Sequence, residues 1–328
     1  MERLRLNIDP FANDHGRWGA SLANNAEIMF PALEAAGVTS VGEVGAYAGD
    51  LTRLLLEWAA QRDATVWAID PLPQAPLREL AENRPDLEIV KATSVEALQT
   101  IPLPDAIILD GDHNYFTVTE ELRIIAERSA GGRLPLLLFH DVCWPHARRD
   151  DYYDPEQIPA EHRQPYAHGG GLHPTEKGLY DGGLPYRYPA KEEGGPRNGV
   201  LTAVEDFAEE HGLTLAVIPS FFGLGLVYDP QAPYADALAE VLAPYDRNPL
   251  MQRLEANRVH HLATVHVQMV AASRAQQRVH ELEAVLYKLL ESGTFSVAEK
   301  LSSIRQGGTP AFSKEEIRRV LQGEGQGS

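Results

Sequence analysis

Apolar runs of strand length alternate with segments of helical spacing through the first two thirds of the chain. The first run typical of a buried strand ends at residue 45. Further runs of this kind cover residues 65–69, 87–90, 105–109 and 134–139. Apolar positions recur every three or four residues in the segments expected to be helices, at 21–36, 51–60, 95–99 and 119–128. Strands that alternate with helices predict an α/β fold with a mostly parallel sheet.

A glycine turn separates the first strand from its helix within residues 41–70, VGEVGAYAGDLTRLLLEWAAQRDATVWAID. The turn from Gly45 to Gly49 has too little side chain to keep a ligand away from the backbone. Asp70 follows the next strand, at the edge where open parallel sheets bind ligands and where a carboxylate can accept two hydrogen bonds from a ribose diol. This order of elements predicts an adenosine-bearing cofactor.

The turn does not match the G-x-G-x-x-G pattern of a dinucleotide site. Glu43 precedes it and would repel a pyrophosphate, but an acid suits a ligand that carries an ammonium group. The pattern E-x-G-x-x-x-G followed by V-W-A-I-D-P resembles motif I and the ribose-binding acid of class I S-adenosylmethionine-dependent methyltransferases. An ordinary βαβ unit with a glycine turn is the alternative. The resemblance implies that the cofactor contacts Glu43, Gly45, Ala46, Tyr47, Gly49, Asp70, Ser94 and Asp110.

Two further strands end in carboxylates. Residues 105–109 lead into D-G-D-H-N-Y, and residues 134–139 lead into H-D-V. This pairing resembles the class I subfamily of macrocin-type and mycinamicin-type sugar O-methyltransferases, over about residues 18–229. The resemblance implies a Rossmann-like class I methyltransferase sheet, in which residues 213–228 form a terminal hairpin with a reversed strand.

Neighbouring strand ends converge on one crevice in such a sheet, so Asp110, His140 and Asp141 should lie together. Two carboxylates in one place favour a cation between them. Oxygen ligands favour Mg²⁺, and His140 would also accept Mn²⁺ or a softer metal. The resemblance gives metal binding to Asp110 and Asp141; the third ligand, for which His140 is the candidate, and metal dependence itself stay open.

Methyl transfer to a hydroxyl also requires a base. His113 lies three residues after Asp110, and an imidazole has an unperturbed pKa of about 6.5. The resemblance gives the base role to this position and makes His113, Asp110 and Asp141 the catalytic set. A structural hydrogen bond at a strand end is the alternative for His113 and for His140.

Two other predictions concern the cofactor. Ser94 corresponds in position to the loop that flanks the adenine in class I methyltransferases, although it could equally be the N-cap of the helix that follows. His15 to Trp18 could close over the methionine end of the cofactor, or Trp18 could be only a packing anchor.

Composition limits the partners and the cellular compartment that are expected for this chain. The net charge of -18 would repel a phosphate backbone, so no nucleic-acid partner is expected. Cys143 is the single cysteine, which excludes an internal disulfide and suits a reducing compartment. The N-terminus does not resemble a signal and no stretch reaches membrane-spanning length, so a cytoplasmic protein without membrane contact is expected.

Residues 143–198 form an insertion rich in Tyr, Pro, Gly, His and Arg. Long connections of this kind are usually lids or binding loops, and this one begins directly after Asp141. Tyr and Arg side chains suit a ring-shaped, hydroxyl-rich or anionic substrate. A partly disordered surface loop is the alternative.

Residues 231–328 are expected to form a helical region, after a catalytic domain at 1–230. No glycine or proline interrupts residues 250–292, so a helix of roughly 60 Å is expected. Short helices are expected at 296–305 and at 313–321, where S-K-E-E resembles a capping box. The seam residues, apolar or small at coiled-coil-like spacing, are Val265, Met269, Ala272, Val279, Leu282, Leu286 and Leu289. Such a stripe favours a homo-oligomer, or else packing back onto the catalytic domain.

The sequence therefore predicts an S-adenosylmethionine-dependent O-methyltransferase that acts on a hydroxyl of a sugar or glycosylated small molecule, with divalent metal assistance. A metal-independent methyltransferase in which His113 or His146 works alone is one alternative, and a non-catalytic scaffold with a methyltransferase-like fold is another. The sequence does not identify the methyl acceptor.

Overall fold

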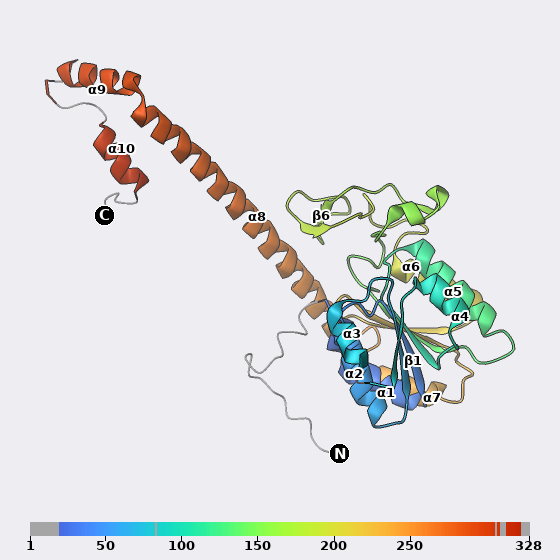
Figure 1. The fold of residues 1–328 in the computed structure, drawn as a ribbon. Helices are drawn as coiled ribbons and strands as arrows, with labels where there is room; N and C mark the ends of the chain where they lie inside the picture. Colours follow the sequence, from blue (N-terminus) through green and yellow to red (C-terminus); the bar gives the residue numbers. More distant parts are fainter. Residues whose placement is uncertain (1–19, 83, 306, 309–312, 323–328) are drawn as a thin grey trace. The chain divides into compact units, whose positions relative to one another are not determined.

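The computed structural model describes residues 20–82, 84–305, 307–308 and 313–322 (Figure 1). The segment from His15 to Trp18, for which two roles are predicted above, lies outside the described residues.

Seven strands form one sheet in the order β3-β2-β1-β4-β5-β9-β8. Their bounds are β1 Ser40–Val44, β2 Thr65–Ile69, β3 Leu87–Val90, β4 Ala106–Leu109, β5 Leu136–His140, β8 Thr214–Ile218 and β9 Leu224–Tyr228. Strands β1 to β5 pair in parallel, while β9 is antiparallel to both β5 and β8. This topology confirms the predicted fold class, including the reversed strand of the terminal hairpin.

Helices cover both faces of the sheet (Figure 1). Their bounds are α1 Ala26–Ala35, α2 Asp50–Ala60, α3 Ala75–Glu82, α4 Ser94–Thr100, α5 Tyr115–Arg128, α6 Val200–His211 and α7 Ala235–Leu242. One apolar cluster lies between the sheet and α1, α2, α3 and α7, and a second lies between the sheet and α4, α5 and α6. Every residue of β4 and β5 is buried, as their continuous apolar runs require.

Two helix starts differ from the predicted ones. Thr93, not Ser94, is the N-cap of α4, and it forms a reciprocal capping box with Glu96. Helix α5 begins four residues before the predicted start, because the Asn114 side chain accepts a hydrogen bond from the Thr117 amide and so caps the helix.

The insertion is folded. It contains the 3₁₀ turns η3 Pro155–Gln157 and η4 Ala160–His162, and a hairpin of β6 Gly170–Leu172 and β7 Leu184–Tyr186. Two of its large polar side chains, Arg149 and Tyr152, are each only 1% exposed. Burial of the Arg149 guanidinium is tolerated because it donates hydrogen bonds to the carbonyls of Ala190 and Lys177.

The chain divides into two compact units, Met1–Thr264 and Val265–Ser328. Helix α8, Pro249–Glu291, crosses this boundary, so the first unit includes α7 and the start of α8, which the sequence analysis places in the C-terminal region. The second unit also contains α9 Gly293–Arg305 and α10 Lys314–Leu321. Ser313 caps α10 by accepting a hydrogen bond from the Glu316 amide. None of the helices in the described part of the chain combines the length and the apolar character that a membrane span requires.

Candidate active site

The glycine turn after β1 lies against the end of β4. Gly45 has a φ of 86°, and its amide donates a hydrogen bond to the Ile69 carbonyl. A Cβ atom at this position would lie 1.9 Å from the carbonyl oxygen of Asp110. Only glycine fits both constraints, so the turn brings the ends of β1, β2 and β4 together.

Asp70 holds this turn in place from the end of β2. One carboxylate oxygen accepts a hydrogen bond from the Tyr47 amide at 2.8 Å, and the other accepts one from the Leu72 amide at 2.7 Å. Each oxygen keeps a lone pair for a further donor. The structure therefore places Asp70 beside the predicted cofactor residues Gly45, Ala46, Tyr47 and Gly49, which belong to one turn.

Glu43 has a different environment. Its side chain is buried and accepts a hydrogen bond of 2.5 Å from the Thr52 hydroxyl on α2. Burial raises the pKa of Glu43 to about 8, although the Thr52 hydrogen bond opposes the shift. The predicted contact with an ammonium group requires an ionised carboxylate, whereas this burial favours the neutral acid. The Glu43 side chain therefore forms a hydrogen bond that links β1 to α2.

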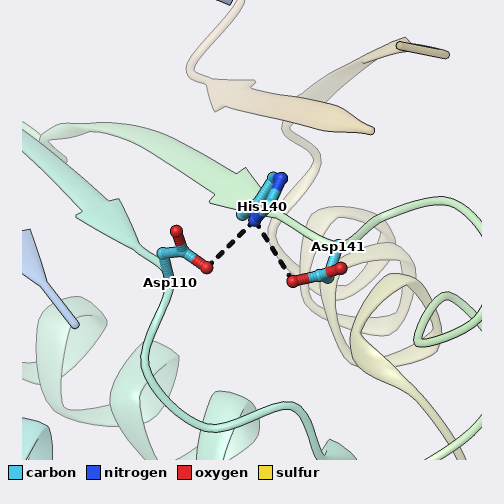
Figure 2. Close-up of side chains that lie close together, drawn as sticks. All are labelled: Asp110, His140 and Asp141. Atoms are coloured by element: carbon cyan, nitrogen blue, oxygen red, sulfur yellow. Dashed lines mark hydrogen bonds and ion pairs between the residues drawn. The ribbon is translucent and has the colours of Figure 1, made fainter. Parts of the chain in front are cut away.

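Asp110, His140 and Asp141 converge at the ends of β4 and β5 (Figure 2). The Nδ1 atom of His140 lies 3.0 Å from an Asp110 oxygen and 3.2 Å from an Asp141 oxygen. One ligand atom from each residue lies within 4.8 Å of the others. Asp141 has a φ of 58°, a left-handed conformation that is uncommon outside glycine and often marks functional sites. The structure thus brings together the three residues predicted to bind metal.

The hydrogen bond made by the other ring nitrogen of His140 shows that this nitrogen carries a proton. Nε2 lies 2.9 Å from the Phe221 carbonyl oxygen, which can only accept, so Nε2 must carry a proton. Nδ1 therefore faces two carboxylates with either a second proton or a cation between them. Ligating histidines commonly donate their other N–H to a backbone carbonyl in this way. One imidazole nitrogen with two carboxylate oxygens is a donor set that fits Mg²⁺ or, better, Mn²⁺ or another transition metal.

The charges of this cluster raise the pKa of His140 and lower that of Asp141. Burial alone would lower the pKa of His140, but the Asp110 and Asp141 carboxylates outweigh burial and raise it well above its ordinary value. Burial would raise the pKa of Asp141, but His140 and His113 hold it well below its usual range. Without a cation, the cluster therefore holds protonated imidazoles beside ionised carboxylates.

His113 lies in the same cluster. Its Nε2 atom is 2.9 Å from an Asp141 oxygen and 3.7 Å from an Asp110 oxygen. Burial opposes the effect, but the Asp141 charge raises the pKa of His113 well above 6.5. The structure thus places His113 beside both carboxylates, which favour its protonated form, and its role as the base stays a prediction. A divalent cation between them would remove the cause of this shift.

His146 and Tyr186, both from the insertion, complete the surroundings of His113. The rings of His113 and His146 stack with centroids 4.7 Å apart, and Tyr186 contacts His146 edge-on at 5.2 Å. His146 is buried, its Nδ1 atom has no hydrogen-bond partner among the described residues, and burial lowers its pKa to about 3. From the sequence, His146 is expected only as an alternative base, and Tyr186 is not expected at the site, because no local motif indicates how the insertion returns over it.

Ser94 is the first residue of α4, and its side chain lowers the pKa of the buried Glu121 on α5. Burial raises the pKa of Glu121 to about 8, so this acid is neutral at pH 7. The adenine contact of Ser94 stays a prediction. Glu121 has no sequence signal of its own, because it occupies an ordinary position of an amphipathic helix.

No protein-family model matches the chain, and no curated protein matches it. Solved structures resemble it at a distance. The methyltransferase PaMTH1 of Podospora anserina, bound to SAH, is 13% identical over 67% of this chain and 82% of its own, with a TM-score of 0.39. A Burkholderia thailandensis 1,6-didemethyltoxoflavin-N1-methyltransferase, with 1,6-didemethyltoxoflavin and S-adenosylhomocysteine bound, is 12% identical over 63% of this chain and 76% of its own, with a TM-score of 0.38.

Human N-acetylserotonin methyltransferase in complex with SAM is 10% identical over 62% of this chain and 51% of its own, with a TM-score of 0.35. Likenesses this distant assign no function, which has to be argued from the site itself.

Proposed function

We propose that the protein is an S-adenosylmethionine-dependent O-methyltransferase that acts on a hydroxyl of a sugar or glycosylated small molecule with divalent metal assistance. The observation that carries the proposal is the arrangement of two sites at one edge of one sheet. The glycine turn with Asp70 lies at the ends of β1 and β2, and the Asp110, His140 and Asp141 cluster lies at the ends of β4 and β5. Transfer between a cofactor and an acceptor requires two such adjoining sites.

The turn from Gly45 to Gly49 and the Asp70 carboxylate would hold the cofactor. The remaining lone pairs of Asp70 suit a ribose diol, and the turn exposes backbone rather than bulky side chains. Ser94 would lie on the adenine side. When bound, S-adenosylmethionine supplies a methyl group activated by a positively charged sulfonium.

Asp110, Asp141 and Nδ1 of His140 would hold the metal ion. When bound, a divalent cation supplies Lewis acidity that lowers the pKa of an acceptor hydroxyl. The chain's own residues do the rest. Asp110 and Asp141 provide the negative charge that binds the ion, and the Phe221 carbonyl keeps the His140 lone pair directed at it.

His113 would accept the proton that the acceptor hydroxyl loses as its oxygen takes the methyl group. Its Nε2 atom lies beside Asp141, on the metal side of the cluster. His146, which is neutral and buried, stacks on one face of the His113 imidazole and would limit the access of water to it. Stacking fixes the ring plane of His113, which would present one nitrogen to the acceptor hydroxyl.

The insertion would form the acceptor site. It starts directly after Asp141, and its Asp151 amide donates a hydrogen bond to the His113 carbonyl at 2.9 Å. Aromatic rings in it contact each other edge-on, including the pairs Tyr166–Tyr188 and His168–Tyr188. Aromatic faces with hydroxyl groups suit sugar rings. We further propose a cytoplasmic protein with no nucleic-acid partner, assembled as a homo-oligomer through α8.

Calorimetry with S-adenosylhomocysteine, followed by activity assays with and without chelation, tests the proposal. The wild-type protein is expected to bind S-adenosylhomocysteine, and Asp70→Ala should lose about 1.5 to 3 kcal/mol of that affinity, because charge-assisted contacts are lost. The exposed Asp63→Ala is the matched control. Methyl transfer to sugars and glycosides should stop after chelation and return with Mg²⁺ or Mn²⁺.

The other outcomes identify the alternatives. A protein that binds neither S-adenosylmethionine nor S-adenosylhomocysteine is a scaffold rather than an enzyme. Full turnover after chelation would indicate a metal-independent methyltransferase that relies on His113 or His146.

A further inference from the structure

The turn between β8 and β9 has an unusual backbone. Phe221 and Phe222 have φ values of 47° and 69°, so two consecutive bulky residues are left-handed. Both carbonyls of this pair face the candidate site. The Phe221 carbonyl accepts a hydrogen bond from His140 Nε2 at 2.9 Å, and the Phe222 carbonyl accepts one from the Cys143 amide at 2.7 Å. Something must hold such a turn in this conformation.

Glu255, at the start of α8, holds it. One carboxylate oxygen accepts a hydrogen bond from the Phe222 amide at 2.7 Å, and the other accepts one from the Phe221 amide at 3.1 Å. The side chain is 8% exposed, and Arg258 pairs with both of its oxygens at 2.6 and 2.7 Å. The Arg258 guanidinium also lies 4.4 Å from the centre of the Phe222 ring. The carboxylate is therefore fixed from both sides.

We propose that Glu255 is a positioning residue for the metal site and acts through Phe221. Its carboxylate fixes the Phe222 amide, the planar peptide between Phe221 and Phe222 fixes the Phe221 carbonyl, and that carbonyl holds the proton on Nε2 of His140. Nδ1 is then presented to Asp110 and Asp141 as a ligand. The part of this inference that concerns metal affinity rests on the proposed function. The part that concerns the hydrogen bond between His140 Nε2 and the Phe221 carbonyl does not, because this bond is present in the protein without metal.

Glu255→Gln is the informative substitution. Both carboxylate oxygens accept from backbone amides, whereas a glutamine side chain of nearly the same shape offers one acceptor and places an NH₂ group against the other amide. The exposed Asn257→Ala, two residues along the same helix, is the matched control. If Glu255→Gln fails to fold, Glu255→Asp takes its place, since it keeps the charge and shortens the reach.

The first readout is the His140 ring in the metal-free protein, by NMR of ¹⁵N-labelled histidines, with His140→Ala to assign the signal. The wild-type protein and Asn257→Ala should show a proton on Nε2 that exchanges slowly with water. Glu255→Gln should show faster exchange and a shifted Nε2 signal. An unchanged His140 signal in Glu255→Gln would overturn the proposal.

The second readout is the affinity for Mn²⁺, measured beside that for S-adenosylhomocysteine. Glu255→Gln should weaken Mn²⁺ binding by about tenfold, as loss of an outer contact typically does, and leave S-adenosylhomocysteine binding unchanged. In a His140→Ala background the same substitution should have no further effect on Mn²⁺ binding. Equal losses in both backgrounds, or a parallel loss of S-adenosylhomocysteine binding, would mean that Glu255 only stabilises the fold.

The two proposals fail separately. If the wild-type protein binds no Mn²⁺, the metal part of the proposed function is wrong, and the NMR signal of His140 still decides the role of Glu255.

Discussion

At the scale of single residues, the two ring nitrogens of His140 have different roles. Nε2 donates to the Phe221 carbonyl and Nδ1 faces two carboxylates, so a proton and a metal ion compete for the same position. Metal binding at this site should therefore weaken as pH falls. His113 shares the carboxylates of the cluster and is affected by the same competition.

His113→Ala should lower turnover by roughly 10² to 10⁴-fold with little change in the affinity for S-adenosylhomocysteine, if His113 is the base. The wild-type rate should rise with pH and then level off, since a base works only when deprotonated. Because Asp141 raises the pKa of His113, this rise should lie above pH 6.5 at low metal concentration and move to lower pH as metal saturates the site.

The pH-rate profile at two Mg²⁺ concentrations, with a thermal melt of the variant, checks this prediction. A variant with normal stability and an unchanged rate at every pH would eliminate His113 from the mechanism. A structural role would instead lower the melting temperature and leave the shape of the profile unaltered.

Glu43 gives a prediction for stability rather than for rate. Its pKa is about 8 in the folded protein against 4.5 in the unfolded chain, so the folded state binds the proton more tightly. The stability that this provides is fully present below pH 4.5 and is lost as pH rises through about 8. Since one pKa unit corresponds to about 1.4 kcal/mol, the loss should be about 2 to 5 kcal/mol.

Glu43→Gln keeps an acceptor for Thr52 but cannot ionise. Its free energy of unfolding in urea should therefore match that of the wild type near pH 5 and exceed it increasingly up to pH 9. Glu57→Gln, an exposed position on α2, is the control. Parallel stability curves for wild type and Glu43→Gln would mean that the buried carboxyl stays close to its ordinary pKa.

At the scale of elements, much of the fold and part of the site follow from local sequence. Asp70 and Asp110 directly follow apolar strands of four or five residues, and His140 ends one, so these side chains lie at one edge of a parallel sheet. The glycine at position 45 is required by a close approach of two strand ends, and the sequence shows it directly.

Other parts of the site depend on contacts between distant segments. Tyr186 reaches His146 only because β6 and β7 pair, and Glu255 reaches Phe221 only because α8 packs beside the hairpin of β8 and β9. Neither contact has a local signature. The start of α4 differs from the prediction by one residue for a local reason. Thr93 and Ser94 are both good caps, and the hydrogen bonds of Thr93 with Glu96 select Thr93.

At the scale of the whole molecule, α8 joins the two units and carries the predicted seam. Val279 and Leu286 are 51% and 38% exposed in the single chain, an arrangement that favours a second copy as partner. Residues at such spacing pack efficiently only against another helix.

Val279→Lys with Leu286→Lys should convert an oligomer into a monomer in sedimentation equilibrium, because two charges would be buried in an apolar seam. Gln277→Lys with Ala284→Lys adds the same charge at exposed positions and should leave the assembly intact. A wild-type protein that sediments as a monomer at all concentrations would contradict the prediction of a homo-oligomer.

The insertion leaves the sheet and returns to it at almost the same point. The Val200 amide donates to the His146 carbonyl at 2.8 Å, and the Leu201 amide donates to the Ala147 carbonyl at 3.1 Å, so the two ends of the segment are joined. The chain between these two points is therefore expected to tolerate changes in length, because its ends stay joined. If the insertion forms the acceptor site, as proposed, exchange of this segment alone would change the acceptor and leave the residues proposed to hold the cofactor and the metal ion unchanged.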